Sequence, residues 1–213
     1  MEKSIFNFLD WLTFACSVAL LGSSLFYSWQ RHLPIFLKIL PGYCLVTVVN
    51  EILVMVFPNG QPLNYLLFTI FELLFFSFVL SLISRNTGFI VILWLLNLVF
   101  LFIVAQYILR RHKLPFGFPE QLESLILIIG CVICYLQMLT SEDNSNLWQK
   151  PGFWMLGGML LYFIFLMPSL VCSTALIHIG QPNLGKWVFS ISNVALLVSY
   201  FFYFKSMTCR SIN

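Results

Sequence analysis

Two glutamates, Glu51 and Glu72, lie inside long apolar runs of the sequence. An ionisable side chain at the centre of a membrane helix costs at least about 2.5 kcal/mol, so each of the two needs an explanation. The runs that contain them are joined by the short break PNGQP, which predicts adjacent antiparallel helices. The two carboxyl groups could then face each other, and two carboxylates at such range would not both ionise easily.

Three asparagines, Asn50, Asn64 and Asn193, fall in the same half of the predicted helices as these acids. Together with Glu51 and Glu72 they predict a polar, ligand-binding cavity that opens towards the side of the amino terminus. The alternative is that the two acids are protonated and bond neighbouring helices as polar contacts within the bundle. The sequence leaves both interpretations open.

Other charged residues lie near the ends of the predicted helices. We interpret Asp10, Glu123 and His178 as structural residues close to the lipid headgroups. Lys38 is expected to extend its amine to the interface while its methylene groups stay in the apolar layer.

The sequence lacks the motifs of common metal sites and active sites. Cys131 and Cys134 form a CxxC motif, but no second CxxC or nearby histidine accompanies it, so we interpret both as small apolar helix residues. No HExxH, GxSxG or Walker A motif occurs. We therefore predict no metal, no cofactor and no enzymatic activity, with an intramembrane enzyme acting on lipid through the two glutamates as an alternative.

The composition requires a lipid environment around these residues. Of 213 residues, 60% are hydrophobic and 9% are charged, whereas roughly a quarter are charged in soluble domains. The net charge of +3 arises from cations between apolar runs rather than on one basic face, which argues against nucleic-acid binding. Barrel strands alternate in polarity over about ten residues, whereas these runs are apolar for about twenty, which predicts an all-α membrane protein.

The runs predict a seven-transmembrane-helix bundle with short loops, organised as a single transmembrane domain over residues 1–213. The predicted spans are 5–28, 35–57, 63–83, 89–109, 122–140, 154–178 and 186–204. Pro41 with Gly42, and Pro168, indicate kinks, while Gly157 and Gly158 indicate close helix packing.

Seven spans place the two termini on opposite sides of the membrane. Lys and Arg number five on the amino-terminal side and six on the other, so the positive-inside rule does not decide the orientation. We favour an amino terminus outside, because the cations of Arg110–Lys113 share one loop whereas those of the other side recur in every break. This cluster and Glu120 are predicted to form a solvated loop.

Three stretches together resemble an uncharacterised seven-transmembrane protein family common in Bacteroidetes: PLNYLLFTIFELLFF, KPGFWMLGGMLLYF and ISNVALLVSYFFYF. The residues that carry the resemblance are Phe68, Thr69, Glu72, Pro151, Phe153, Trp154, Gly158, Tyr162 and Asn193. The chain departs from the family pattern at Met155 and Leu156, where a small polar residue usually follows the FW pair. Members of this family are often encoded near sensor kinases or response regulators, which implies a sensory or signalling role.

The leading hypothesis is a multi-pass protein of the cell (plasma) membrane that binds a small or lipid-like ligand in the polar cavity and signals through helix movement. Because its loops are short, the output would pass to a separate signalling protein. The alternative is an oligomeric membrane effector or channel-like subunit, whose polar half would line a pore between copies of the chain. Membrane lipid is an expected partner in either case, and nucleic acid is not.

Overall fold

The computed structural model describes residues 2–29, 33–57, 61–109, 117–140 and 146–209. Within these residues it contains seven long helices, two short ones and no strand. The long helices are α1 (Glu2–Ser28), α3 (Leu40–Val56), α4 (Gln61–Ile83), α5 (Thr87–Leu109), α6 (Phe118–Thr140), α7 (Pro151–His178) and α8 (Pro182–Thr208). The short ones are α2 (Ile35–Lys38) and the 3-10 helix η2 (Leu147–Gln149). The predicted all-α bundle of seven spans is confirmed.

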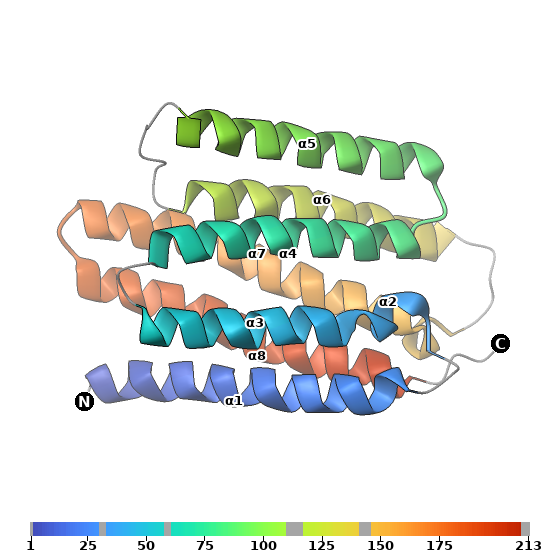
Figure 1. The fold of residues 1–213 in the computed structure, drawn as a ribbon, viewed down its shortest axis with the longest axis horizontal. Coiled ribbons are helices and arrows are strands. Elements are labelled where there is room, and N and C mark those ends of the chain that lie inside the picture. The colour runs from blue at the N-terminus through green and yellow to red at the C-terminus, as the bar shows by residue number, and fades with distance from the viewer. Residues whose placement is uncertain (1, 30–32, 58–60, 110–116, 141–145, 210–213) are drawn as a thin grey trace.

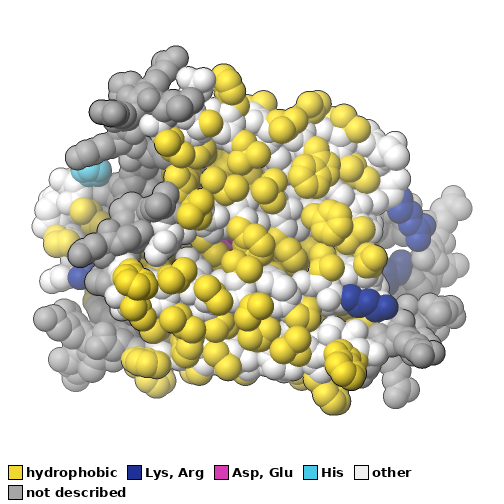
Figure 2. Space-filling model, in the orientation of Figure 1, with side chains coloured by type: hydrophobic (Ala, Val, Ile, Leu, Met, Phe, Trp, Pro, Cys, Tyr) yellow, Lys and Arg dark blue, Asp and Glu magenta, His cyan; other side chains and the backbone are white. Residues whose placement is uncertain are grey.

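The chain is a multi-pass membrane protein. Seven helical segments are long and apolar enough to cross a membrane, with α2 and α3 forming one of them together. Large hydrophobic side chains cover the face shown in Figure 2, while Lys and Arg side chains lie towards its two ends. In lipid, a helix satisfies its backbone hydrogen bonds internally, so apolar faces of this kind are stable without a protein cover.

Six of the long helices form a closed ring. Going around the ring, α1 contacts α3, α3 contacts α4, α4 contacts α6, α6 contacts α7, α7 contacts α8, and α8 contacts α1. Helix α5 packs outside this ring against α4 and α6, at the edge of the bundle (Figure 1). Helix α1 begins at one end of the bundle and α8 ends at the other, and we name these the amino-terminal and carboxy-terminal ends. The interior of the ring is where side chains from six helices can meet.

Several helices begin earlier than the apolar pattern predicts. The predicted starts at 122, 154 and 186 were wrong by three or four residues, because the first turns of α6, α7 and α8 contain prolines, accompanied by polar residues in α6 and α8. Proline is tolerated there because the first backbone N–H groups of a helix have no partner within it. Pro41 occupies the same kind of position, just after a break at Ile39 that separates α2 from α3.

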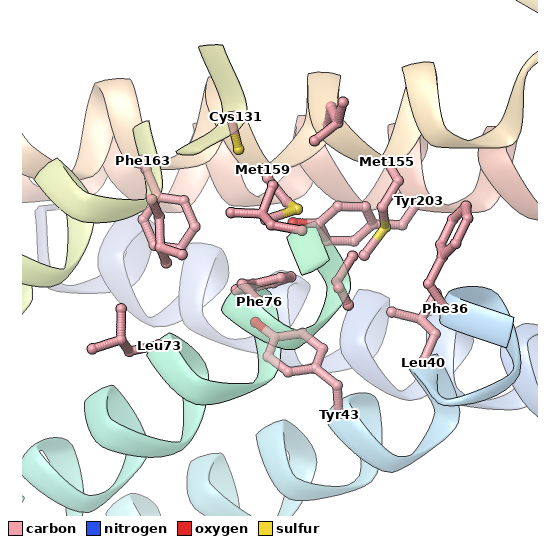
Figure 3. Packing of buried hydrophobic residues seen from close by; sticks show 14 of the residues in the cluster. Phe36, Leu40, Tyr43, Leu73, Phe76, Cys131, Met155, Met159, Phe163 and Tyr203 are labelled. Atoms are coloured by element: carbon pink, nitrogen blue, oxygen red, sulfur yellow. The ribbon is translucent and has the colours of Figure 1, made fainter. Parts of the chain in front are cut away.

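The interior is filled by aromatic and sulfur-containing side chains. Figure 3 shows Tyr43 from α3 and Tyr203 from α8 on either side of Phe76 from α4, with ring centroids 4.9 Å and 6.4 Å from that of Phe76. A Cβ atom added to Gly158 would lie 2.7 Å from a ring carbon of Tyr203, and one added to Gly157 would lie 2.8 Å from the hydroxyl of Tyr135. Both glycines therefore permit the close approach of α7 to its neighbours, as predicted from the sequence.

Candidate functional site

Glu72 lies near the middle of α4 and points into the ring. Its side chain is only 3% exposed, and its Oε1 atom accepts a hydrogen bond of 2.6 Å from the hydroxyl of Tyr43 on α3. The ring of Tyr43 is held between Phe75 and Phe76, with centroids 4.9 Å from each. This packing fixes the phenol, so its hydroxyl is preorganised to donate to the carboxyl group.

Glu123 on α6 lies much deeper than the sequence suggested. It is 1% exposed, and its Oε1 atom has no hydrogen-bond partner among the described residues. Its electrostatic neighbours are the acids Glu72 and Glu120. The side chain is more enclosed than its place near the predicted start of the span suggested, because α6 begins at Phe118 and places Glu123 in its second turn.

Glu120 is also placed differently from the prediction. It belongs to the first turn of α6 rather than to a solvated loop, it is half-buried, and its Oε2 atom is buried without a described hydrogen-bond partner. Glu120, Glu123 and Glu72 therefore lead from the amino-terminal end of the bundle towards its middle. The predicted loop residues Arg110–Lys113 lie outside the described residues.

A second polar chain joins α1, α3 and α8. The Ser17 hydroxyl donates to Oε1 of Glu51 over 3.0 Å and lies 3.0 Å from the Tyr200 hydroxyl. The two sequence-predicted acids thus hydrogen-bond to different helices, Glu51 to α1 and Glu72 to α3. Tyr200 lies within electrostatic range of both carboxyl groups.

Tyr162 on α7 completes the set of polar side chains in the ring. It lies within electrostatic range of both Glu72 and Glu123. Each of the six ring helices therefore contributes a hydroxyl or carboxyl group to this region. We call Glu72 and Glu123 the interior acid pair, because both carboxyl groups are buried and lie within electrostatic range of each other.

The remaining predicted residues occupy less enclosed positions. Asn50, Asn64 and Asn193 are each partly exposed, and their role in ligand binding stays a prediction. His178 is exposed at the last residue of α7, and Lys38 is exposed at the end of α2. The Asp10 side chain lies outside the described part of the structure.

Sequence reasoning missed the hydroxyl partners of the acids and a further buried polar contact. Ser77 donates to Oδ1 of Asn97 over 3.3 Å between α4 and α5, outside the ring. Asn97 is 1% exposed, and its Nδ2 group has no described partner. Asn97, an amide in the middle of the apolar 89–109 run, was the available signal for this contact.

The two cysteines of the CxxC motif lie in the apolar core of the bundle. Cys131 and Cys134 are buried in the core, and the thiol of Cys134 lies 3.9 Å from the carbonyl oxygen of Leu80 on α4. Within the part of the chain that the structure describes, no three His, Cys, Asp or Glu side chains gather at a spacing that could hold a metal ion.

Comparisons of the chain with protein-family models, with curated proteins and with solved structures found no match. The site must therefore be interpreted from its own geometry. Chemically, the interior acid pair offers buried hydrogen-bond acceptors, with tyrosine hydroxyls beside them. A proton, a cation or a donor group of a bound molecule would satisfy these acceptors.

Proposed function

We propose that this membrane protein is a sensory or signalling component whose ligand is small or lipid-like and carries a positive charge or hydrogen-bond donors. The observation that carries the proposal is the Oε1 atom of Glu123, which is buried in the ring, has no hydrogen-bond partner among the described residues and has two acids as electrostatic neighbours. A buried acceptor without a donor is costly, and two neighbouring carboxyl groups repel each other if both ionise. A cationic or donor-bearing ligand relieves both costs.

The route to the pair runs from the amino-terminal end. Glu120, in the first turn of α6, is half-buried, and Glu123 follows one turn deeper on the same helix. A positively charged group can thus pass from one acid to the next before it reaches Glu72. An amino-terminal-side cavity was expected from the sequence, and the proposal adds Glu123 to its predicted residues.

The helices around the pair offer a way to convert binding into movement. Tyr43 ties Glu72 to α3, whose start is separated from α2 by the break at Ile39. Tyr162 lies on α7, which continues through Pro168, a residue that cannot donate the helical hydrogen bond to Ile164. A ligand that draws Glu72 and Glu123 together would shift α3 and α7 at these weakened points and so signal to a separate protein.

The channel alternative is less well supported by this arrangement. A pore between copies of the chain needs polar side chains on the outer surface, whereas the interior acid pair faces the inside of one ring and the outer face carries large apolar side chains. Determining the mass of the protein in mild detergent distinguishes the two, because a pore of this kind requires a ring of copies.

Ligand binding is tested by thermal unfolding of the purified protein in a non-ionic detergent with octylammonium as the probe. Octanol, which has the same chain but no charge, controls for effects on the micelle. We expect octylammonium to raise the unfolding temperature of the parent protein and to leave that of Glu123→Gln unchanged. The control variant Asn97→Leu, which removes a buried polar group outside the ring, should respond like the parent protein.

An equal response of Glu123→Gln and the parent protein would contradict the proposed site. The signalling role is tested separately in cells that carry Glu72→Gln in place of the parent gene. Glutamine keeps most of the hydrogen bonding and removes the charge. If gene expression in cells with the folded Glu72→Gln variant is the same as in cells with Asn97→Leu, Glu72 is structural.

A further inference from the structure

A cavity of about 570 Å³ lies at the carboxy-terminal end of the bundle, opposite the acids. This volume falls within the range of about 300–1,000 Å³ that is typical of ligand pockets. Its polar wall is formed by Arg85 and Asn86 between α4 and α5, by Thr87 at the start of α5, by Gln137 on α6, and by Lys150 just before α7. Three separate segments therefore bring two cations and two amides to one space.

Hydrogen bonds hold this wall in place. The hydroxyl of Ser84 donates to Oε1 of Gln137 over 2.8 Å, which leaves the amide N–H groups of Gln137 to donate elsewhere. The backbone N–H of Asn86 donates to the same hydroxyl over 3.2 Å, and the Asn86 side chain accepts from the N–H of Phe89. The turn that carries Arg85 is thus closed by its own contacts.

Two basic side chains, those of Arg85 and Lys150, line the cavity. Thr87 is the first residue of α5, where the helix dipole adds partial positive charge. The acidic side chains that the structure describes belong to the middle of the bundle or to its other end. Guanidinium, ammonium and amide donors together suit the oxygens of a phosphate group.

Tryptophans and a further cation lie at the same end of the bundle as the cavity. Trp148, two residues before Lys150, is 61% exposed, and the amine of Lys205 lies 5.9 Å from the ring centroid of Trp154. Exposed tryptophans with cations beside them mark the boundary between the apolar layer and water. We propose that this cavity binds a phosphate-bearing anion. The headgroup of an anionic membrane lipid is the expected source of this phosphate.

The test measures binding of phosphatidylglycerol to the purified full-length chain by native mass spectrometry, with phosphatidylcholine as the reference lipid. Each cation near a membrane surface strengthens binding to anionic lipid about fivefold. The double variant Arg85→Gln/Lys150→Gln should therefore weaken the preference for phosphatidylglycerol roughly 25-fold. The matched control is Lys38→Gln/Lys205→Gln, which removes the same charge from the same end but leaves the cavity wall intact. This control should keep most of the preference. The single variants Arg85→Gln and Lys150→Gln provide the same comparison if the double variant fails to fold.

Inorganic phosphate separates the two sources of the ligand. If it displaces phosphatidylglycerol, the site takes a soluble phosphate compound; if the lipid stays bound, the site takes the headgroup. Equal losses in Arg85→Gln/Lys150→Gln and in Lys38→Gln/Lys205→Gln would overturn the proposal, because binding would then follow total charge. A loss on neutralising the two acids of segment 141–145, in Glu142→Gln/Asp143→Asn, would also overturn it, because an anion site does not need carboxylates.

Discussion

Replacing Tyr43 by phenylalanine tests whether the interior hydroxyl groups satisfy the acids. The substitution removes one oxygen atom and keeps the ring that packs against Phe75 and Phe76. It deletes the 2.6 Å hydrogen bond to Glu72, whose side chain is 3% exposed and has little access to water. Loss of a partner to a buried acceptor costs about 1–3 kcal/mol. We therefore expect Tyr43→Phe to lower the free energy of unfolding by that amount.

A second background makes the prediction specific to the bond. In Glu72→Leu the acceptor is absent, so the Tyr43 hydroxyl becomes the buried group without a partner. In that background Tyr43→Phe should be neutral or stabilising. The two effects of the same substitution should differ by about 1–3 kcal/mol, which is the coupling energy of a double-mutant cycle.

The assay is reversible unfolding in mixed micelles of a non-ionic detergent and dodecyl sulfate, for the parent protein and the three variants. Tyr135→Phe is the matched control, because its hydroxyl donates over 2.8 Å to the backbone carbonyl of Phe153 rather than to Glu72. Its effect should be the same with glutamate or leucine at position 72. If Tyr43→Phe also had equal effects in both backgrounds, the reasoning about the interior hydrogen bond would be refuted.

Three further outcomes follow from the fold. Gly158→Ala should destabilise the protein by about 1–3 kcal/mol in thermal unfolding, because the added Cβ would lie 2.7 Å from a ring carbon of Tyr203. The control Gly22→Ala, whose added Cβ would have no atom within 4 Å, should be neutral or slightly stabilising. Burial raises the pKa of the Cys209 thiol, although Lys205 lowers it, so less thiolate forms at neutral pH than in glutathione. Alkylation of Cys209, followed by peptide mass spectrometry, should therefore be slower than alkylation of glutathione and should become faster as the pH rises. Equal alkylation rates for the two thiols would contradict this. Reporter domains fused to the two chain ends should lie on opposite sides of the membrane, and we expect the amino-terminal reporter outside; reporters on the same side would contradict the topology.

The fold was predictable from the sequence because lipid imposes a simple rule on helix length. Apolar runs of about twenty residues separated by turn residues give the spans directly, and five of the predicted ends, at 28, 83, 109, 140 and 178, match the structure. The starts were less predictable, since a first turn of proline and polar residues resembles a loop. This error also placed Glu120 and Glu123 too close to the surface.

The candidate site was predictable only in part. An acid in an apolar run is conspicuous, so Glu72 was identified from the sequence. Its partner Tyr43 was not, because a tyrosine in such a run resembles an ordinary core or interface aromatic. Pairing Glu72 with Glu123 requires the order of helices around the ring, in which α4 lies against α6, and chain order does not reveal that contact.

The central claim is that a donor-bearing ligand contacts the interior acid pair. Solid-state NMR measures this contact directly, through the dipolar coupling between the nitrogen of ¹⁵N-labelled octylammonium and the carboxyl carbons of ¹³C-labelled glutamate in the membrane-reconstituted protein. We predict a coupling that corresponds to hydrogen-bond contact, lost in Glu123→Gln and kept in Asn97→Leu. A coupling that persists in Glu123→Gln, or bound octylammonium with no coupling to any glutamate, would contradict the claim.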